Sequence, residues 1–308
     1  MSSARPEISY LPPQGYPLGV NPWFRFGAGV LKPILNSIIK KDWRGSQHLP
    51  KSGAAIVVCN HLSYVDPLTF THFLYNNGRA PRYLGKESVF RIPIIGRVIR
   101  GAGQIPVSRE SKDAVKGLEH AIAVLKAGHL LGVYPEGTLT RDENLWPMKA
   151  KTGVARLALI TGAPVIPCAS WGPEKVLPPY SKKLRLFPRS KVSILMGPAV
   201  DLSPWQGKSD DLEAVEAAAD HIMERLQDKY YLQEIERVDH TIPDWKQMLI
   251  MSCCRINIIA NSSFSWWAAY INDHPLKTVI YPSVWFGPKL QHMDASDMCP
   301  KNDDWIKI

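Results

Sequence analysis

Residues 54–67 read AAIVVCNHLSYVDP, and this stretch decides the fold class. Its first part, Ala54–Val58, is a short and uninterrupted apolar run, which predicts a strand buried on both faces, as in a parallel sheet. Ligands bind at the carboxyl ends of such strands. The chain turns polar at Asn60, and His61 follows directly. The stretch therefore predicts both a buried strand and a functional site at its end.

The candidate site begins with His61 and Asp66, which stand five residues apart. If a turn and a helix begin between them, the carboxylate can accept a hydrogen bond from the imidazole Nδ1–H. Nε2 is then free to take a proton from an alcohol. This is the base and orienting acid of a catalytic triad without a protein nucleophile. The spacing alone is weak, because a surface histidine and an unrelated aspartate give the same pattern.

Strand-like and helix-like stretches alternate from residue 54 to residue 230. Apolar runs predict strands at Leu130–Tyr134, Val165–Cys168 and Val192–Met196, and helical spacing predicts helices at Asp113–Ala127, Thr152–Ile160 and Asp211–Tyr230. This order predicts an α/β fold with a mostly parallel central sheet flanked by helices.

The chain of 308 residues is 45% apolar and has a net charge of +9. That charge belongs to residues 1–235, which have 30 Lys and Arg against 20 Asp and Glu, whereas residues 236–308 have 7 against 8. A basic surface attracts nucleic acid, acidic lipid headgroups or phosphorylated substrates. No nucleic-acid-binding motif is visible, so we expect a lipid or phosphorylated partner and no nucleic acid.

A second candidate segment, GAGQIPVSR, covers residues 101–109. Gly103 lets the backbone approach a ligand, and the Arg109 guanidinium can fork onto a phosphate. The alternative is a solvated arginine that closes a strand.

A third segment, YPEGTLTR, covers residues 134–141 and follows a predicted strand. Glu136 can hold a substrate hydroxyl, and the amides of Gly137 and Thr138 can face an anion. The alternative is an ordinary strand–loop connection. A fourth segment, APVIPC at residues 163–168, can shape an apolar wall but carries no reactive group.

The order and separation of NHLSYVD, GQIPVSR, YPEGT and VIP resemble the glycerolipid acyltransferase family, best known for 1-acylglycerol-3-phosphate acyltransferases. The similarity runs over roughly residues 20–230 and looks greatest to the actinobacterial branch. It implies an enzyme that transfers an acyl group from acyl-CoA or acyl carrier protein to the 2-hydroxyl of 1-acylglycerol 3-phosphate, giving phosphatidic acid. It implies no metal and no cofactor, the acyl donor being a co-substrate.

The resemblance also implies a role for each matched position. His61 would be the general base and Asp66 its orienter. The acceptor would be bound by Lys86, Gly103, Arg109, Glu136, Gly137 and Thr138. The chain departs from the family at Leu139, where many members have arginine, and at Pro106, where many have an aromatic residue. These departures bear on the acceptor more than on the chemistry.

Residues 21–39 combine aromatic and aliphatic side chains with Arg25 and Lys32, and further cations follow. This composition suits amphipathic helices that lie in a bilayer interface, kinked or divided at Pro33. A core-packing helix is the alternative, and the resembled family has membrane-docking helices here. Five cysteines without metal-type spacing indicate free thiols in a reducing compartment. With no secretory signal and no apolar run of about 18 residues, we expect a peripheral protein on the cytoplasmic face of the cell membrane.

The character of the chain changes near residue 236. Asn257–Ala260, Ser263–Ile271 and Lys277–Tyr281 predict one βαβ unit with nothing obvious to complete its sheet. The stretch IIANSSFSWWAAY resembles the C-terminal end of the α-1,2-fucosyltransferases, which use GDP-fucose, but their H-x-R-R-G-D motif is absent. We expect an acyltransferase domain at 1–235 and a partial, non-functional fucosyltransferase-like fragment at 236–308. The alternatives are a GDP-fucose-dependent fucosyltransferase, a bifunctional fusion and an inactive lipid-binding protein.

Overall fold

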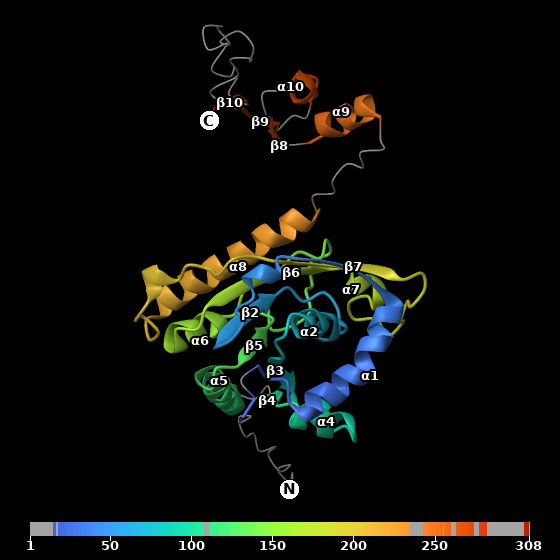
Figure 1. The fold of residues 1–308 in the computed structure, drawn as a ribbon. Helices are drawn as coiled ribbons and strands as arrows, with labels where there is room; N and C mark the ends of the chain where they lie inside the picture. Colours follow the sequence, from blue (N-terminus) through green and yellow to red (C-terminus); the bar gives the residue numbers. More distant parts are fainter. Residues whose placement is uncertain are drawn as a thin grey trace. The chain divides into compact units, whose positions relative to one another are not determined.

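The computed structural model of the chain describes residues 15–16, 18–107, 111–234, 243–254, 256–259, 263–273, 277–281 and 305–307. The chain forms two compact units, Met1–Ile235 and Glu236–Ile308, which we call unit 1 and unit 2 (Figure 1). Arg109, and residues 260–262 of the IIANSSFSWWAAY stretch, lie outside the described residues.

A seven-stranded sheet forms the centre of unit 1, with the strand order β1-β7-β6-β2-β5-β3-β4. Its pairings are parallel except that of β6 with β7, which is antiparallel. The strands are β1 (Ile39–Arg44), β2 (Ala55–Cys59), β3 (Pro81–Lys86), β4 (Ile105–Val107), β5 (Leu130–Val133), β6 (Val165–Trp171) and β7 (Ser190–Met196). The predicted α/β fold with a mostly parallel central sheet is confirmed.

Helices cover both faces of this sheet (Figure 1). The helices are α1 (Pro22–Ile38), α2 (Asp66–Asn76), α3 (Glu87–Phe90), α4 (Ile95–Gly101), α5 (Ser111–Lys126), α6 (Gly153–Thr161), α7 (Pro173–Val176) and α8 (Leu212–Glu234). One hydrophobic core lies between the sheet and α5, α6 and α8, and the other between the sheet and α1, α2 and α7.

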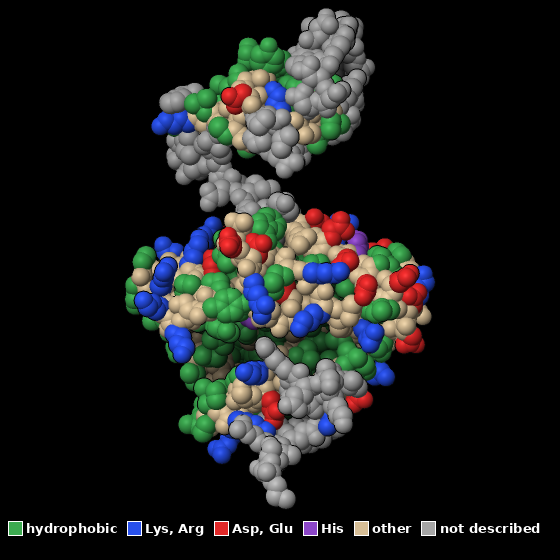
Figure 2. Space-filling view, turned by 180° about the vertical axis from the view of Figure 1, so that it is seen from behind, with side chains coloured by type: hydrophobic (Ala, Val, Ile, Leu, Met, Phe, Trp, Pro, Cys, Tyr) green, Lys and Arg blue, Asp and Glu red, His purple; other side chains and the backbone are tan. Residues whose placement is uncertain are grey.

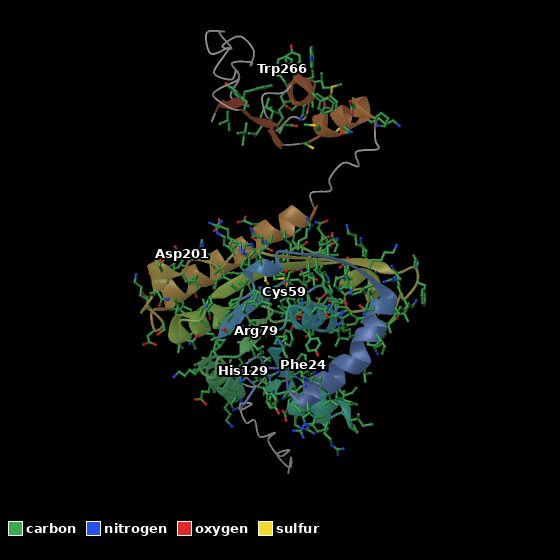
Figure 3. All side chains as sticks on the ribbon, in the orientation of Figure 1. Phe24, Cys59, Arg79, His129, Asp201 and Trp266 are labelled. Atoms are coloured by element: carbon green, nitrogen blue, oxygen red, sulfur yellow. The ribbon has the colours of Figure 1, made fainter. Side chains whose placement is uncertain are left out.

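β2 supplies side chains to both cores. Ile56 and Val58 lie in the first core, and Ala55, Val57 and Cys59 lie in the second. Figure 3 labels Cys59 within unit 1. All five are fully buried, and burial of each Val or Ile contributes about 1.5–3 kcal/mol. A strand that is covered on both faces needs apolar residues at every position, which explains the uninterrupted run.

α1 begins where the sequence provides a cap. The Asn21 side chain accepts a hydrogen bond from the Phe24 N–H at 2.8 Å, and Pro22 takes the first helical position. The helix then continues through Pro33 as one element, so of the two predicted outcomes at that residue, a kink or a division, the division does not occur.

β1 is not predicted by the sequence, because its residues IKKDWR show neither an apolar run nor clean alternation. It pairs in parallel with β7, with Ile39 opposite Ser190, and Ile39 is fully buried. Its place in the sheet depends on a partner far along the chain. Local pattern reading does not reach that partner.

Unit 2 contains the predicted βαβ arrangement. β8 (Ile256–Ile258) pairs in parallel with β9 (Thr278–Tyr281), and α10 (Ser263–Tyr270) lies between them in the chain, after α9 (Asp244–Ser252). A third strand, β10 (Trp305–Lys307), pairs with the free edge of β9. The sequence did not predict this third strand. In the portions of the chain that the structure describes, no helix combines the length and apolar character needed to cross a membrane.

Candidate active site

The site begins at Asn60, where β2 ends. The Asn60 side chain is fully buried and forms two hydrogen bonds with the backbone of Ser170 on β6. Its Nδ2 donates to the Ser170 carbonyl at 2.9 Å, and its Oδ1 accepts from the Ser170 N–H at 2.7 Å. This pair of bonds ties the end of β2 to β6 and thereby fixes the residue that follows.

That residue, His61, contacts Asp66. The imidazole Nδ1 lies 2.9 Å from Asp66 Oδ2, and the same oxygen accepts the backbone N–H groups of Leu62 at 2.6 Å and Ser63 at 2.7 Å. Asp66 is the first residue of α2, so its carboxylate can turn back onto the preceding loop. An ionised carboxylate is the natural acceptor of three such donors. The contact favours the imidazole with its proton on Nδ1.

The two side chains differ in their access to solvent. The His61 side chain is 15% exposed, whereas the Asp66 side chain is fully buried. Burial raises the pKa of Asp66, and the hydrogen bonds from His61, Ser63 and Leu62 act in the opposite direction. The geometry thus provides a reachable imidazole whose orienting carboxylate is shielded from water.

Glu136 holds the main chain of His61. Its Oε1 accepts the His61 N–H and its Oε2 accepts the Met148 N–H, both at 2.9 Å, and the residue is 3% exposed. The Thr140 N–H donates to the His61 carbonyl, also at 2.9 Å. Burial raises the pKa of Glu136 to about 7, against the effect of these hydrogen bonds. Both carboxylate oxygens thus already bind backbone amides, and the predicted contact with a substrate hydroxyl stays a prediction.

Tyr134 packs against the imidazole, a contact that the sequence reading missed. The two rings stack with their centroids 4.1 Å apart and an interplanar angle of 20°. Tyr134 is the residue that follows β5, the strand beside β2. An aromatic residue just before Pro-Glu-Gly-Thr could have signalled this packing.

The parallel strands bring some, but not all, of the other predicted residues to one edge. β2, β5 and β3 are neighbours, so His61, Glu136 and Lys86 follow or end strands whose carboxyl ends share an edge. Gly103 instead precedes β4 and therefore lies toward the opposite edge. Its φ of +76° explains why glycine stands there. The structure does not bring Gly103 to the site.

In the turn after β5, the predicted Gly137 amide is not free to bind an anion, but a lysine side chain lies beside it. The Gly137 N–H donates to the Tyr134 carbonyl at 2.9 Å, so this amide is already used. Gly137 has a φ of +72°, and a side chain at this position would lie 2.9 Å from Lys151 Cε and Nζ. Thr138 is half-buried beside it. The ammonium group of Lys151 therefore lies against the Glu136–Thr138 turn.

Lys151 is a candidate that the sequence reading missed. Its N–H donates to the Pro135 carbonyl at 2.9 Å, which fixes its backbone next to the turn. Its side chain is exposed, whereas Leu139, at the position where many resembled proteins have arginine, is only 2% exposed and has no charge. The signal in the sequence was the pair of lysines in MKAKTG, residues 148–153.

Residues 41–171 match the family model called Acyltransferase. This range contains His61, Asp66, Glu136 and Lys151, together with the strands that position them. Residues 41–171 are thus similar to an acyltransferase domain. Residues 209–300 match a second model, Glycosyl transferase family 11, which begins before α8 and extends into unit 2. Two successive stretches of the chain thus match models of two different families, as expected of the predicted fusion.

Named relatives of the acyltransferase domain are 1-acyl-sn-glycerol-3-phosphate acyltransferases. The chloroplastic protein BAT2 of Brassica napus is 32% identical over 145 residues, which are 46% of this chain and 40% of that protein. The Bacillus subtilis protein is 27% identical over 56% of this chain and 80% of its own length. An uncharacterized protein of Mycobacterium tuberculosis is 29% identical over 59% of this chain and 54% of its own length. The chain spans about two fifths of the length of the plant relatives that it matches.

A solved structure shares the fold of the domain. It is the 1-acyl-sn-glycerophosphate acyltransferase PlsC of Thermotoga maritima, with a TM-score of 0.52 and 24% identity. The match covers 68% of this chain and 82% of that protein. The likeness supports the arrangement of sheet and helices described above.

Proposed function

We propose that the protein transfers an acyl group from a thioester donor to the 2-hydroxyl of 1-acylglycerol 3-phosphate, giving phosphatidic acid. The observation that carries this proposal is the contact of 2.9 Å between His61 Nδ1 and Asp66 Oδ2. It sits at the end of β2, inside a domain whose named relatives are acyltransferases for this acceptor.

In the proposed reaction, His61 Nε2 accepts the proton of the acceptor hydroxyl as that oxygen attacks the thioester carbonyl carbon. The buried Asp66 carboxylate stabilises the imidazolium that forms. The C–S bond of the resulting tetrahedral adduct then breaks, and the leaving thiolate takes the proton back from His61. General-base assistance of this kind contributes about 10²–10⁴-fold in rate.

Cations at the same edge of the sheet fit an acceptor that carries a phosphate. Lys151 Nζ lies against Gly137, and Lys86 is an exposed residue at the end of β3. A lysine ammonium binds a phosphate as a point charge. We assign to Lys151 the role that arginine fills in many resembled proteins at the position of Leu139. Arg109 is retained as a second proposed phosphate contact.

The acyl chains of donor and acceptor need an apolar environment. The face of unit 1 seen in Figure 2 is hollowed, and hydrophobic side chains line the hollow. α1 also exposes large hydrophobic side chains, Phe26 at 58% and Ile34 at 51% among them. Such a helix fits the interface of a bilayer, so residues 21–39 are proposed to dock the protein on the cytoplasmic face of the cell membrane.

Release of free thiol from acyl-CoA, measured with and without lysophosphatidic acid, tests the proposal. We expect acceptor-dependent thiol release by the full chain and its loss in His61→Ala. Circular dichroism of the variant controls for folding. Acceptor-dependent turnover by His61→Ala above a tenth of the wild-type rate would remove His61 from the role of base. Lipid binding without any turnover by the wild type would favour an inactive lipid-binding protein.

A glycosyl-transfer activity is the second candidate, because residues 209–300 match Glycosyl transferase family 11. In unit 2 the described strands form a sheet of only three strands, and its hydrophobic core is small. Titration of the full chain with GDP-fucose in a calorimeter tests this candidate. We expect no binding, and a saturable signal would assign a donor site to unit 2.

A further inference from the structure

The turn between α3 and α4 presents isoleucines to solvent. Arg91 to Ile95 are five consecutive exposed residues with the sequence RIPII. Ile94 is 74% exposed, Ile95 is 51% exposed and Ile92 is 44% exposed. Three exposed isoleucines at one convex turn are unfavourable in water unless another apolar phase covers them.

The backbone of this turn is strained at its most exposed residue. Ile94 has φ +65° and ψ −63°, and the Ile95 N–H donates to the Pro93 carbonyl at 2.7 Å. These values define a three-residue turn of the rare kind, in a region that β-branched residues avoid. Glycine would adopt it freely, so isoleucine here indicates a use for the side chain.

The structure below the turn keeps it in place. Phe90 is 1% exposed, and its carbonyl accepts a hydrogen bond from Arg100. Gly96 lies so close to this carbonyl that a side chain on Gly96 would meet it at 2.0 Å. The Gly96 N–H also donates to the Ile92 carbonyl at 2.7 Å. The turn is thus held in place by the packed residues and hydrogen bonds below it.

The turn adjoins the exposed face of α1. The Asn21 side chain donates to the Gly101 carbonyl at 2.8 Å, and a side chain on Gly101 would meet the Trp23 ring at 2.4 Å. α1 and α4 lie side by side (Figure 1). Trp23 and Phe26 are 43% and 58% exposed. The apolar side chains of the turn and of the start of α1 therefore belong to neighbouring elements.

The charges around the turn and α1 indicate whether a membrane or a protein covers these apolar side chains. Residues 21–41 and residues 88–109 contain no Asp or Glu, but they contain arginines and lysines. Arg97 on α4 is exposed and forms no ion pair among the described residues. Figure 2 shows hydrophobic side chains gathered over α4 with Lys and Arg side chains among them. Glu87, at the start of α3, forms an ion pair with Arg91 of the turn, so the surround contains one acidic group and is cationic in net charge. Apolar side chains with such a surround fit an anionic bilayer surface.

We propose that the Arg91–Ile95 turn inserts its isoleucines into an anionic lipid surface and that α1 lies on the same surface beside it. This inference rests on the proposed function, because it defines how an enzyme for lipid substrates reaches them. It adds a second docking element to residues 21–39. Arg97 would lie at the level of the headgroups.

Co-sedimentation of the full chain with vesicles tests the proposal without any turnover, so an inactive enzyme would leave the test intact. The vesicles are phosphatidylcholine with or without phosphatidylglycerol. The key variant is Ile94→Gly, which relieves the backbone and removes the apolar side chain. We expect its vesicle affinity to fall about tenfold, while its midpoint of thermal unfolding rises by about 2–4 °C.

Two further variants complete the test. Ile94→Leu keeps an apolar side chain and should retain wild-type affinity. Leu212→Gly is the matched control, because Leu212 is 58% exposed at the start of α8, on the other side of the sheet. It should also bind vesicles as the wild type does.

Three results would overturn the proposal. The first is wild-type vesicle affinity in Ile94→Gly. The second is an equal loss of affinity in Leu212→Gly. The third is self-association of the wild type in sedimentation that Ile94→Gly abolishes, which would assign the turn to a second copy of the chain.

Discussion

Replacement of Asp66 by asparagine separates the charge of this residue from its hydrogen bonds. Asp66 Oδ2 accepts three N–H donors, from His61, Leu62 and Ser63. In Asp66→Asn the side-chain amide should place its oxygen at the position of Oδ2, because its NH₂ group would face three N–H donors at that position. The NH₂ group then replaces Oδ1, which has no partner among the described residues. The variant should keep the imidazole in its orientation and lose only the negative charge.

The expected loss of activity follows from that charge. When His61 gains a proton in the reaction, the imidazolium and the carboxylate lie about 4 Å apart. Coulomb's law at an effective dielectric constant of about 20 gives an attraction of about 4 kcal/mol. Its loss corresponds to a decrease of about 10³-fold in kcat. The buried amide N–H groups without partners should lower the free energy of unfolding by about 1–3 kcal/mol.

Steady-state thiol release, with acyl-CoA and lysophosphatidic acid both varied, measures this effect. We expect kcat of Asp66→Asn to fall and the KM of the acceptor to change little, while urea denaturation shows a folded protein. Asp66→Ala, which removes the acceptor of all three hydrogen bonds, should lose at least as much activity and more stability. Retention of more than a tenth of the wild-type kcat in Asp66→Asn would refute the role of the carboxylate in stabilising the imidazolium.

Three other predictions follow from the site. Burial raises the pKa of Glu136 to about 7, so the folded state favours the protonated carboxyl group. The stability that this protonation contributes is present below the ordinary pKa of about 4.5 and is lost as pH rises through about 7. Urea denaturation of the wild type and of Glu136→Gln across that pH range measures this effect. As pH rises, the free energy of unfolding of the wild type should fall by about 3 kcal/mol relative to that of the variant. A difference that does not change with pH would contradict the burial argument. Lys151→Met should raise the KM for lysophosphatidic acid about tenfold or more, and equal effects on monoacylglycerol would show that Lys151 does not read the phosphate. Asn60→Ala should lower the free energy of unfolding by about 2–5 kcal/mol, because two buried backbone groups of Ser170 lose their partners. Urea denaturation measures this loss, and a loss below about 0.5 kcal/mol would contradict the prediction.

The sequence predicted the parts of the fold that depend on local pattern. β2, β5 and β6 were predicted from apolar runs that are covered on both faces, and α5, α6 and α8 from helical spacing. β1 and β10 were missed, since each gains its place by pairing with a strand distant in sequence. The antiparallel pairing of β7 was not predicted either. No local pattern encodes which strand a segment will join.

The candidate site shows the same division. The contact between His61 and Asp66 was predicted, because only six residues separate the end of β2 from the start of α2, which leaves few ways for the two side chains to be placed. The roles of Tyr134 and Lys151 were missed, since stacking and a close approach to Gly137 depend on how the loop folds over the sheet. Gly103 was predicted at the site because a glycine backbone can approach a ligand. In the structure, its positive φ instead allows the chain to turn at the end of α4.

Both main-chain groups of His61 are held by the segment that follows β5, through Glu136 and the Thr140 N–H. The exposed residues from Arg141 to Asn144 lie farther along this segment and form no contact with the imidazole among those described. The position of the imidazole therefore depends on the first part of this segment and not on residues 141–144. Relatives could therefore differ at residues 141–144 while the main chain of the histidine stays where it is.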